Sequence, residues 1–171
     1  MFRRVGRKGG EKEYYEVVKE KLAQLFRERG VNVYLEITAS GVFSNRIKSE
    51  IPHDREIIFS FLRKVAPDIT GFVERSGSSE FVVVEVKRNE IGLDDIYQLR
   101  KYADLFDAKF SFLVSLKPVP EEIKRLSKAV YAILARPSIY HVFVLTYFDG
   151  KSGEFVEWFE ENPFTKSIYW R

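Results

Sequence analysis

The sequence feature that most constrains the fold of this chain is the end of one apolar strand. The residues from Phe81 to Val84 form an unbroken apolar run, which continues as Glu85-Val86-Lys87. Successive side chains of a strand point to opposite faces of its sheet, so Glu85 and Lys87 share one face while Val84 and Val86 share the other. We therefore expect a buried strand that carries a carboxylate and an amine together near its end.

A second carboxylate is expected beside this pair. Pro67-Asp68 opens the stretch 68–74, which has the composition of a strand, and residues 75–79 are rich in Gly and Ser. Two strands joined by such turn residues form a hairpin. Hairpin pairing would bring Asp68 alongside Glu85.

Two carboxylates and an amine in one place suit chemistry on phosphates. The carboxylate oxygens, together with the Val86 carbonyl, are ligands of the kind that Mg²⁺ prefers, and such a site keeps several waters. Lys87 would orient or deprotonate the attacking water, or stabilise charge developing on the phosphorus oxygens. The alternative is structural: Glu85 and Lys87 form a solvated ion pair, and Pro67-Asp68 opens a turn.

The pattern Pro67-Asp68 … Glu85-Val86-Lys87 resembles the PD-(D/E)xK nuclease superfamily, which includes restriction endonucleases, archaeal Holliday junction resolvases and RecB-like nucleases. The resemblance implies an α/β fold with a restriction endonuclease-like core, in which helices flank a central mixed β-sheet. A C-terminal helix and β-hairpin would extend this core.

The same resemblance implies a metal-dependent nuclease that hydrolyses DNA phosphodiester bonds, as an endonuclease of DNA repair, recombination or restriction. Mg²⁺ would be its cofactor, with Mn²⁺ as a substitute. Asp68, Glu85 and the Val86 carbonyl would hold the metal, and Lys87 would be the catalytic amine. The rival from another class is a non-catalytic nucleic-acid-binding or assembly module that keeps the nuclease fold.

A further match lies on the helix expected after this strand. Gln98 and Tyr102 are four residues apart and so share one helix face. A Gln-x-x-x-Tyr pattern in this place resembles the RecB-like branch, which implies that Gln98 binds a DNA phosphate or a water at the site. Tyr102 would pack beneath it; it also fits the apolar stripe of the helix, so core packing is its alternative role.

The superfamily often adds a glutamate from the first helix. Four glutamates lie on the helix expected over residues 11–29: Glu11, Glu13, Glu16 and Glu20. The helical period places Glu11 on the apolar face, in the sector of Tyr14, and the other three toward solvent. We therefore favour Glu11, while Glu13 remains an alternative because its spacing from the preceding glycine pair matches resolvase-like relatives. Surface exposure is the default for all four.

Hydrophobic periodicity predicts one domain over residues 11–171, preceded by a flexible basic arm over residues 1–10 that contacts phosphates or is simply a frayed terminus. The segment 39–64 is ambiguous, because either a helix over 55–65 capped by Asp54 or a strand over 57–62 fits it. The other expected helices cover 11–29, 92–106, with Asp94 or Asp95 as its cap, and 121–135. The expected strands cover 31–38, 68–74, 81–87, 110–116, 140–148 and 154–159.

Composition sets the remaining limits. With 171 residues, of which 45% are hydrophobic, the chain is long and apolar enough to fold around a core. It has no Cys, which excludes disulfides, thiolate zinc sites and a cysteine nucleophile. It shows neither a membrane-spanning run nor a signal peptide, so we expect a soluble cytoplasmic protein. The net charge of +3 is too mild to indicate a nucleic-acid binder by itself.

DNA is the expected partner, and cleavage of both strands of a duplex commonly requires a dimer. The C-terminal end is rich in aromatic residues, which would form a homodimer interface or complete the core: Trp158, Phe159, Phe164, Tyr169 and Trp170. The high content of charged residues and the single Met also suggest a thermophilic source.

Overall fold

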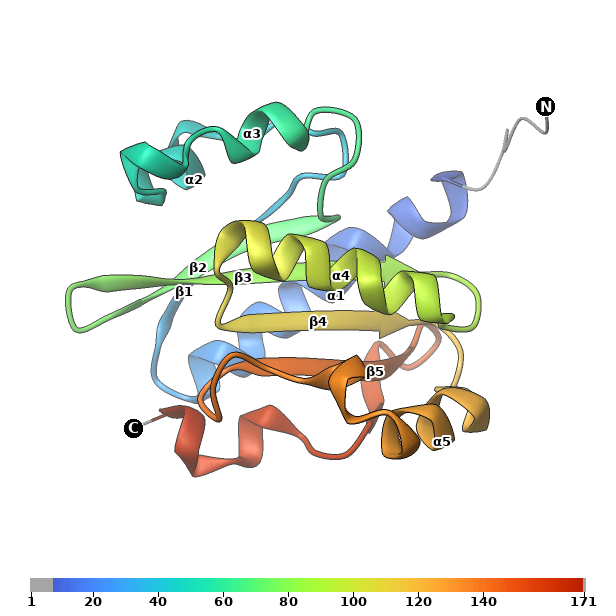
Figure 1. Cartoon of the computed structure of the whole chain (residues 1–171). Helices are drawn as coiled ribbons and strands as arrows, with labels where there is room; N and C mark the ends of the chain where they lie inside the picture. Colours follow the sequence, from blue (N-terminus) through green and yellow to red (C-terminus); the bar gives the residue numbers. More distant parts are fainter. Residues whose placement is uncertain (1–7, 171) are drawn as a thin grey trace.

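The computed structural model describes residues 8–170 and shows an α/β architecture with one six-stranded mixed sheet (Figure 1). The strands lie across the sheet in chain order. They are β1 (Asn32–Ile37), β2 (Ile69–Arg75), β3 (Ser78–Lys87), β4 (Phe110–Ser115), β5 (Val142–Asp149) and β6 (Glu154–Trp158). Neighbouring strands are antiparallel, except that β3, β4 and β5 run parallel to one another.

Helices cover both faces of this sheet, which confirms the expected flanked mixed sheet. One face is covered by α1 (Lys8–Glu28) and by the C-terminal segment after β6, which contains two short 3₁₀ helices, Pro163–Thr165 and Ser167–Trp170. The helices of the other face are α2 (Asn45–Glu50), α3 (Ile58–Phe61), α4 (Leu93–Phe106) and α5 (Glu121–Ala129), with 3₁₀ turns at His53–Arg55 and Tyr131–Leu134.

The hairpin of β2 and β3 forms as expected, around a two-residue turn at Ser76 and Gly77. Both turn residues have positive φ, 47° and 80°, which is the backbone form that matches the twist of paired strands. The register pairs Arg75 with Ser78 next to the turn and continues to the far end of β2. Asp68, the residue before β2, therefore falls opposite Glu85.

The alternation predicted for β3 is confirmed. Val84 and Val86 pack in the core that lies under α1, whereas Val83 packs in the core that lies under α4. Glu85 and Lys87 are in phase with Val83, so they point to the α4 face. Both cores consist of large aliphatic and aromatic side chains, which hold the strand rigidly in place.

The ambiguous segment 39–64 is neither the long helix nor the strand that the sequence allowed. It forms α2, a 3₁₀ turn and α3, and its buried residues Phe43, Ile47, Ile58 and Leu62 pack on the α4 face. Ile58 and Leu62 are buried four residues apart, which is helical spacing. Asp54 caps no helix, because it lies within the 3₁₀ turn, and Ser44 caps α2 instead.

Other helix boundaries also need correction. Helix α1 begins at Lys8, so residues 8–10 belong to it rather than to a flexible arm, and residues 1–7 lie outside the described part of the chain. Helix α5 ends at Ala129 instead of 135, because Val130 is extended. Helix α4 begins at Leu93, close to the expected start, but its N-cap is Gly92 rather than Asp94 or Asp95, which lie in its first turn. Asp95 accepts a hydrogen bond from the Gly92 N–H at 2.9 Å.

The aromatic C-terminal segment completes the core on the α1 face. Phe164 and Tyr169 are buried, and the Trp170 ring stacks on Phe110 with centroids 5.4 Å apart. These rings are thus occupied within the chain, which favours the core role over the dimer interface. None of the helices in residues 8–170 has both the length and the apolar character needed to cross a membrane.

Candidate active site

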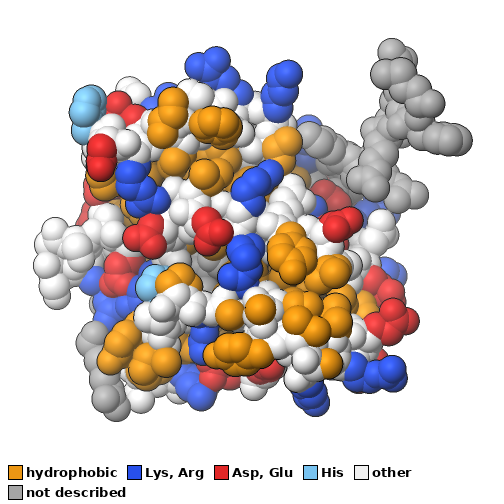
Figure 2. All heavy atoms as spheres, viewed as in Figure 1, with side chains coloured by type: hydrophobic (Ala, Val, Ile, Leu, Met, Phe, Trp, Pro, Cys, Tyr) orange, Lys and Arg blue, Asp and Glu red, His pale blue; other side chains and the backbone are white. Residues whose placement is uncertain are grey.

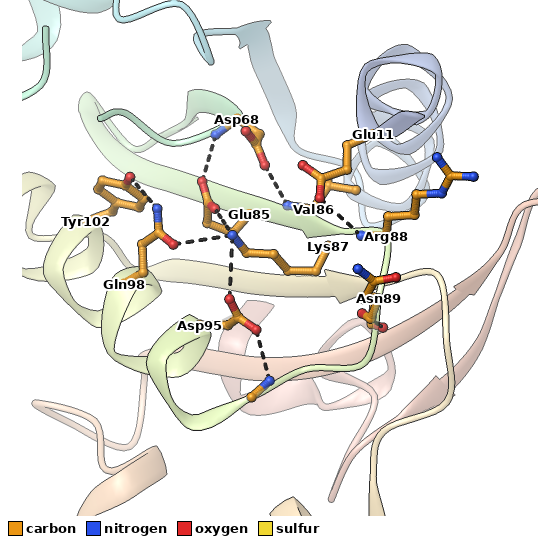
Figure 3. Close-up of polar contacts among 12 residues, drawn as sticks. Glu11, Asp68, Glu85, Val86, Lys87, Arg88, Asn89, Asp95, Gln98 and Tyr102 are labelled. Atoms are coloured by element: carbon orange, nitrogen blue, oxygen red, sulfur yellow. Dashed lines mark hydrogen bonds and ion pairs between the residues drawn. The ribbon is translucent and has the colours of Figure 1, made fainter. Parts of the chain in front are cut away.

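A cavity of about 670 Å³ opens at the sheet end where β2 begins and β3 finishes. Its walls come from α1, from the end of β1, from the connection between α3 and β2, and from α4. All five side chains predicted for the site line this cavity: Glu11, Asp68, Glu85, Lys87 and Gln98. Figure 3 shows how they converge from three different elements and from the residue before β2.

Asp68 and Glu85 lie in direct contact. The Asp68 N–H donates to Glu85 Oε1 at 3.1 Å, and the Val86 N–H donates to Asp68 Oδ2 at 2.8 Å. The Asp68 carboxylate thus takes the place of a backbone acceptor where the β2 ladder ends. Asp68 is 8% exposed and Glu85 is 2% exposed, so the alternative of a solvated ion pair on the surface is wrong.

Both carboxyl groups hold their protons more tightly than free carboxyl groups do. Burial raises the pKa of Asp68 to about 6, although hydrogen bonds from Val86 and Tyr15 act in the opposite direction. Burial, followed by repulsion from Asp68, raises the pKa of Glu85 to about 8, against the attraction of Lys87. A cation bound between the two groups would relieve this repulsion.

Lys87 is held by three acceptors. Its Nζ lies 3.2 Å from Glu85 Oε2 and 3.6 Å from Asp95 Oδ1, and it donates to Gln98 Oε1 at 3.3 Å. Burial lowers the pKa of the Lys87 ammonium, but the attraction of Glu85 and Asp95 outweighs burial and the pKa is raised. Lys87 is therefore charged at neutral pH, which favours orientation and charge stabilisation over deprotonation of a water.

Gln98 and Tyr102 share a face of α4, as their spacing predicted. Gln98 Nε2 donates to the Tyr102 hydroxyl at 3.0 Å, which leaves the amide oxygen directed at Lys87. Tyr102 is fully buried and packs in the core under α4, so the core role is confirmed for its ring. Gln98 lines the cavity and links the Lys87 ammonium to that core.

Glu11 faces the cavity, whereas Glu13 is exposed to solvent. The Glu11 carboxylate accepts a hydrogen bond from the Arg88 N–H at 3.4 Å, directly after β3 (Figure 3). The repulsion of Glu11 also contributes to the raised pKa of Asp68. Of the two alternatives, Glu11 is thus the glutamate of α1 that lies beside the carboxylate pair.

Tyr15 is a site residue that the sequence analysis missed. It lines the cavity, is buried, and its hydroxyl hydrogen-bonds the Asp68 carboxylate. Burial, and then the negative charge of Asp68, raises the pKa of Tyr15, so the hydroxyl remains a donor. The sequence signal that could have identified Tyr15 is its position four residues after Glu11, on the same face of the helix. The apolar face of α1 had been placed on Tyr14, which is only half-buried.

The donor set fits a small oxygen-binding cation. Within residues 8–170 no group of three or more His, Cys, Asp or Glu side chains is arranged to hold a metal ion. Mg²⁺ does not need such a group, because it is commonly held by one or two carboxylates and several waters. The Val86 N–H points to Asp68, and in a strand the carbonyl of a residue points to the same side as its N–H. Asp68, Glu85 and the Val86 carbonyl therefore suit Mg²⁺.

Comparison with known proteins does not assign the chain to a family. No protein-family model matches the chain, and neither curated proteins nor solved structures include a significant match. A functional assignment therefore depends on the cavity and on the chemistry of its residues.

Proposed function

We propose that this chain is a Mg²⁺-dependent nuclease of the PD-(D/E)xK type, with a restriction endonuclease-like core, that hydrolyses DNA phosphodiester bonds. One observation carries the proposal: two buried acidic residues, Asp68 and Glu85, in contact with each other and with a charged lysine beside them, at the floor of an open cavity. Buried ionisable groups whose pKa values are strongly perturbed are characteristic of functional sites.

Asp68, Glu85 and the Val86 carbonyl would hold the metal. A bound Mg²⁺ would polarise the scissile phosphate and lower the pKa of a coordinated water. The Tyr15 and Val86 hydrogen bonds orient the Asp68 carboxylate toward the cavity, so that its geometry is set before any ligand enters.

Lys87 would stabilise the negative charge that develops on the phosphoryl oxygens. Its ammonium is preorganised by Glu85, Asp95 and Gln98, which lie on two different elements. Such fixed donors require no reorganisation as charge develops, which is why they are effective in catalysis. Loss of Gln98 would leave Asp95 as the partner of the ammonium on α4.

The charges at the mouth of the cavity favour a polyanion. Lys12 and Lys64 both line the cavity, one on α1 and the other before β2. Phosphate groups of a DNA strand would contact these lysines, while one phosphodiester would lie over Asp68 and Glu85.

The test compares Asp68→Asn with Asp54→Asn, an exposed control in the 3₁₀ turn. The unmodified chain and the control should cleave linear or circular DNA in Mg²⁺ and not in EDTA, whereas D68N should lose about 1000-fold or more of the rate. Undiminished cleavage by a correctly folded D68N would reject the proposal.

The rival proposal is a non-catalytic DNA-binding module. The hydrogen bonds that Asp68 and Glu85 already make within the chain favour it, because they give both groups a structural role. Calorimetric titration of the unmodified chain with Mg²⁺ distinguishes the two. Binding that D68N abolishes supports the nuclease, and no binding together with no cleavage supports the module.

A further inference from the structure

An exposed apolar surface borders the cavity on the α3 side. It consists of Val42, Ile57, Phe61 and Val65, which we call the α3 patch; Phe61 and Val42 are 72% and 71% exposed. Figure 2 shows hydrophobic side chains gathered in the upper part of the molecule, where Figure 1 places α2 and α3. Side chains this exposed contribute nothing to the core.

The α3 patch is continuous with the wall of the cavity. Val65 lines the cavity together with Lys64, directly after α3. Ile57, the N-cap residue of α3, lies one helical turn before Phe61, so both side chains lie on the same side of this helix. The loop that carries Val42 packs against the end of α3, since a Cβ atom on Gly41 would lie only 2.2 Å from the Arg63 carbonyl oxygen.

Cations without partners flank this apolar surface. Arg63, Lys64 and, on α1, Lys12 are exposed, and their side chains make no hydrogen bond or ion pair within the described part of the chain. Several other lysines of the chain lie in ion pairs, as Lys109 does with Glu80 at 2.6 Å. Apolar surface bordered by uncompensated positive charge matches a strand of nucleic acid, whose phosphates are anionic and whose bases have apolar faces.

We propose that the α3 patch binds unstacked bases of the DNA strand whose phosphate enters the cavity, with Phe61 as the stacking ring. The substrate is then DNA with a single-stranded segment, such as a fork, a flap or a frayed end. A fully paired duplex keeps its bases stacked inside and presents no free face to Phe61. This inference rests on the proposed nuclease function for the position of the phosphate.

Binding in EDTA tests this inference without any cleavage. Fluorescence anisotropy measures the affinity of the full chain for three labelled DNAs of one sequence: a single strand, a fork and a blunt duplex. Phe61→Ala should weaken binding of the single strand and the fork about 10-fold, and binding of the duplex less than about 2-fold. Phe61→Tyr keeps a ring and should bind like the unmodified chain.

Tyr131→Ala is the matched control, because Tyr131 is 86% exposed and does not line the cavity. It should leave all three affinities unchanged. A second variant, with Arg63→Gln and Lys64→Gln combined, should weaken all three DNAs alike, since phosphate contacts do not depend on base pairing.

Three outcomes overturn the inference: F61A binds all three DNAs as the unmodified chain does, F61A weakens all three equally, or the unmodified chain binds none of them. The last outcome would point to an apolar protein partner for the α3 patch. Failure of the nuclease proposal is seen separately, as cleavage that D68N does not reduce, and it leaves a selective effect of F61A on binding intact.

Discussion

The carboxylate pair in the cavity and the carboxylate of Glu161 differ in how their charge is balanced. Glu161 accepts a hydrogen bond from the Tyr169 hydroxyl at 2.5 Å, and Lys166 and Arg136 lie 2.6 Å and 3.6 Å away. Partial burial raises the pKa of Glu161, but the hydrogen bonds of Lys166 and Tyr169 and the attraction of both cations outweigh burial, so the pKa is lowered.

Asp68 and Glu85 also have a tyrosine and a lysine beside them, yet their pKa values are raised. Here one ammonium, that of Lys87, is divided among Glu85, Asp95 and Gln98, and both carboxyl groups are far more buried. The Glu161 cluster neutralises itself and stabilises the C-terminal segment. The pair in the cavity is not neutralised within the chain in this way and its pKa values stay raised, as is expected of a ligand-binding site rather than a structural one.

The largest difference should appear when each glutamate is neutralised. Glu85→Gln should reduce the initial cleavage rate of forked DNA in Mg²⁺ about 1000-fold or more, because it removes a proposed metal ligand. Glu161→Gln should remain within about 2-fold of the unmodified chain. Circular dichroism checks that both variants fold, and an equal loss in both would mean that the comparison has no functional meaning.

Substitution of Lys87 should affect cleavage far more than substitution of Lys166, as expected for the two glutamates. Lys87→Met should lower the cleavage rate about 100-fold by removing the fixed charge near the phosphoryl oxygens. Lys166→Met, which removes the partner of Glu161, should leave the rate unchanged. Single-turnover rates at saturating protein measure both, and a K87M variant with the full rate would exclude Lys87 from catalysis.

Stability should respond to pH in opposite directions at the two clusters. The pKa values of Asp68 and Glu85 rise on folding from 3.8 and 4.5 to about 6 and about 8. The unfolded chain therefore holds fewer protons between these limits, and stability falls as pH rises. In EDTA, Tm should drop on the order of 5 °C from pH 5.5 to pH 8.5.

The double variant Asp68→Asn, Glu85→Gln should not show the drop in Tm between pH 5.5 and pH 8.5. Added Mg²⁺ should make the drop smaller in the unmodified chain and should have no such effect in the double variant. The lowered pKa of Glu161 acts oppositely, since its stabilisation is lost as pH falls through the acid range. Glu161→Gln should therefore lower Tm at pH values above the acid range. It should leave the drop in Tm between pH 5.5 and pH 8.5 intact. Calorimetric scans across pH measure all of these effects, and a flat profile of the unmodified chain would contradict them.

The smallest effect concerns the two tyrosines. Tyr15→Phe should weaken Mg²⁺ binding about 5-fold, because one hydrogen bond that orients Asp68 is lost. Tyr169→Phe removes the corresponding bond to Glu161 and should leave Mg²⁺ affinity unchanged. Isothermal titration calorimetry gives both values, and equal affinities for Y15F and the unmodified chain would make Tyr15 a packing residue only.

Much of the sheet was predictable because its signals are local. The turn at Ser76 and Gly77 is marked by composition, and the alternation of β3 alone determined that Glu85 and Lys87 share a face. The resemblance of Gln98 and Tyr102 to the RecB-like branch, rather than periodicity, predicted that Gln98 lies near the site. The metal, the nuclease chemistry and the DNA substrate are still proposals, since residue types and spacing indicate chemistry without demonstrating it.

The segment 39–64 and Tyr15 were not predictable for a physical reason. Ile58 and Leu62 are buried because α3 packs on the sheet, and a short helix has too few turns to show this in its periodicity. Tyr14 and Tyr15 are adjacent and equally apolar, so the face of α1 could be displaced by one residue. The core role of the C-terminal rings could not be predicted for a similar reason. Phe110, on which Trp170 stacks, lies far away in the chain.

The two-residue turn between β2 and β3 acts at a distance from the cavity. The turn sets the register of β2 against β3, and this register, counted from Ser76 and Gly77, places Asp68 opposite Glu85. A shift of the pairing of β3 on β2 by one residue would make every side chain of β3 exchange faces. Glu85 would then point into the apolar layer under α1. The turn at the exposed tip, by fixing this register, thus determines the cavity chemistry without contributing any residue to it.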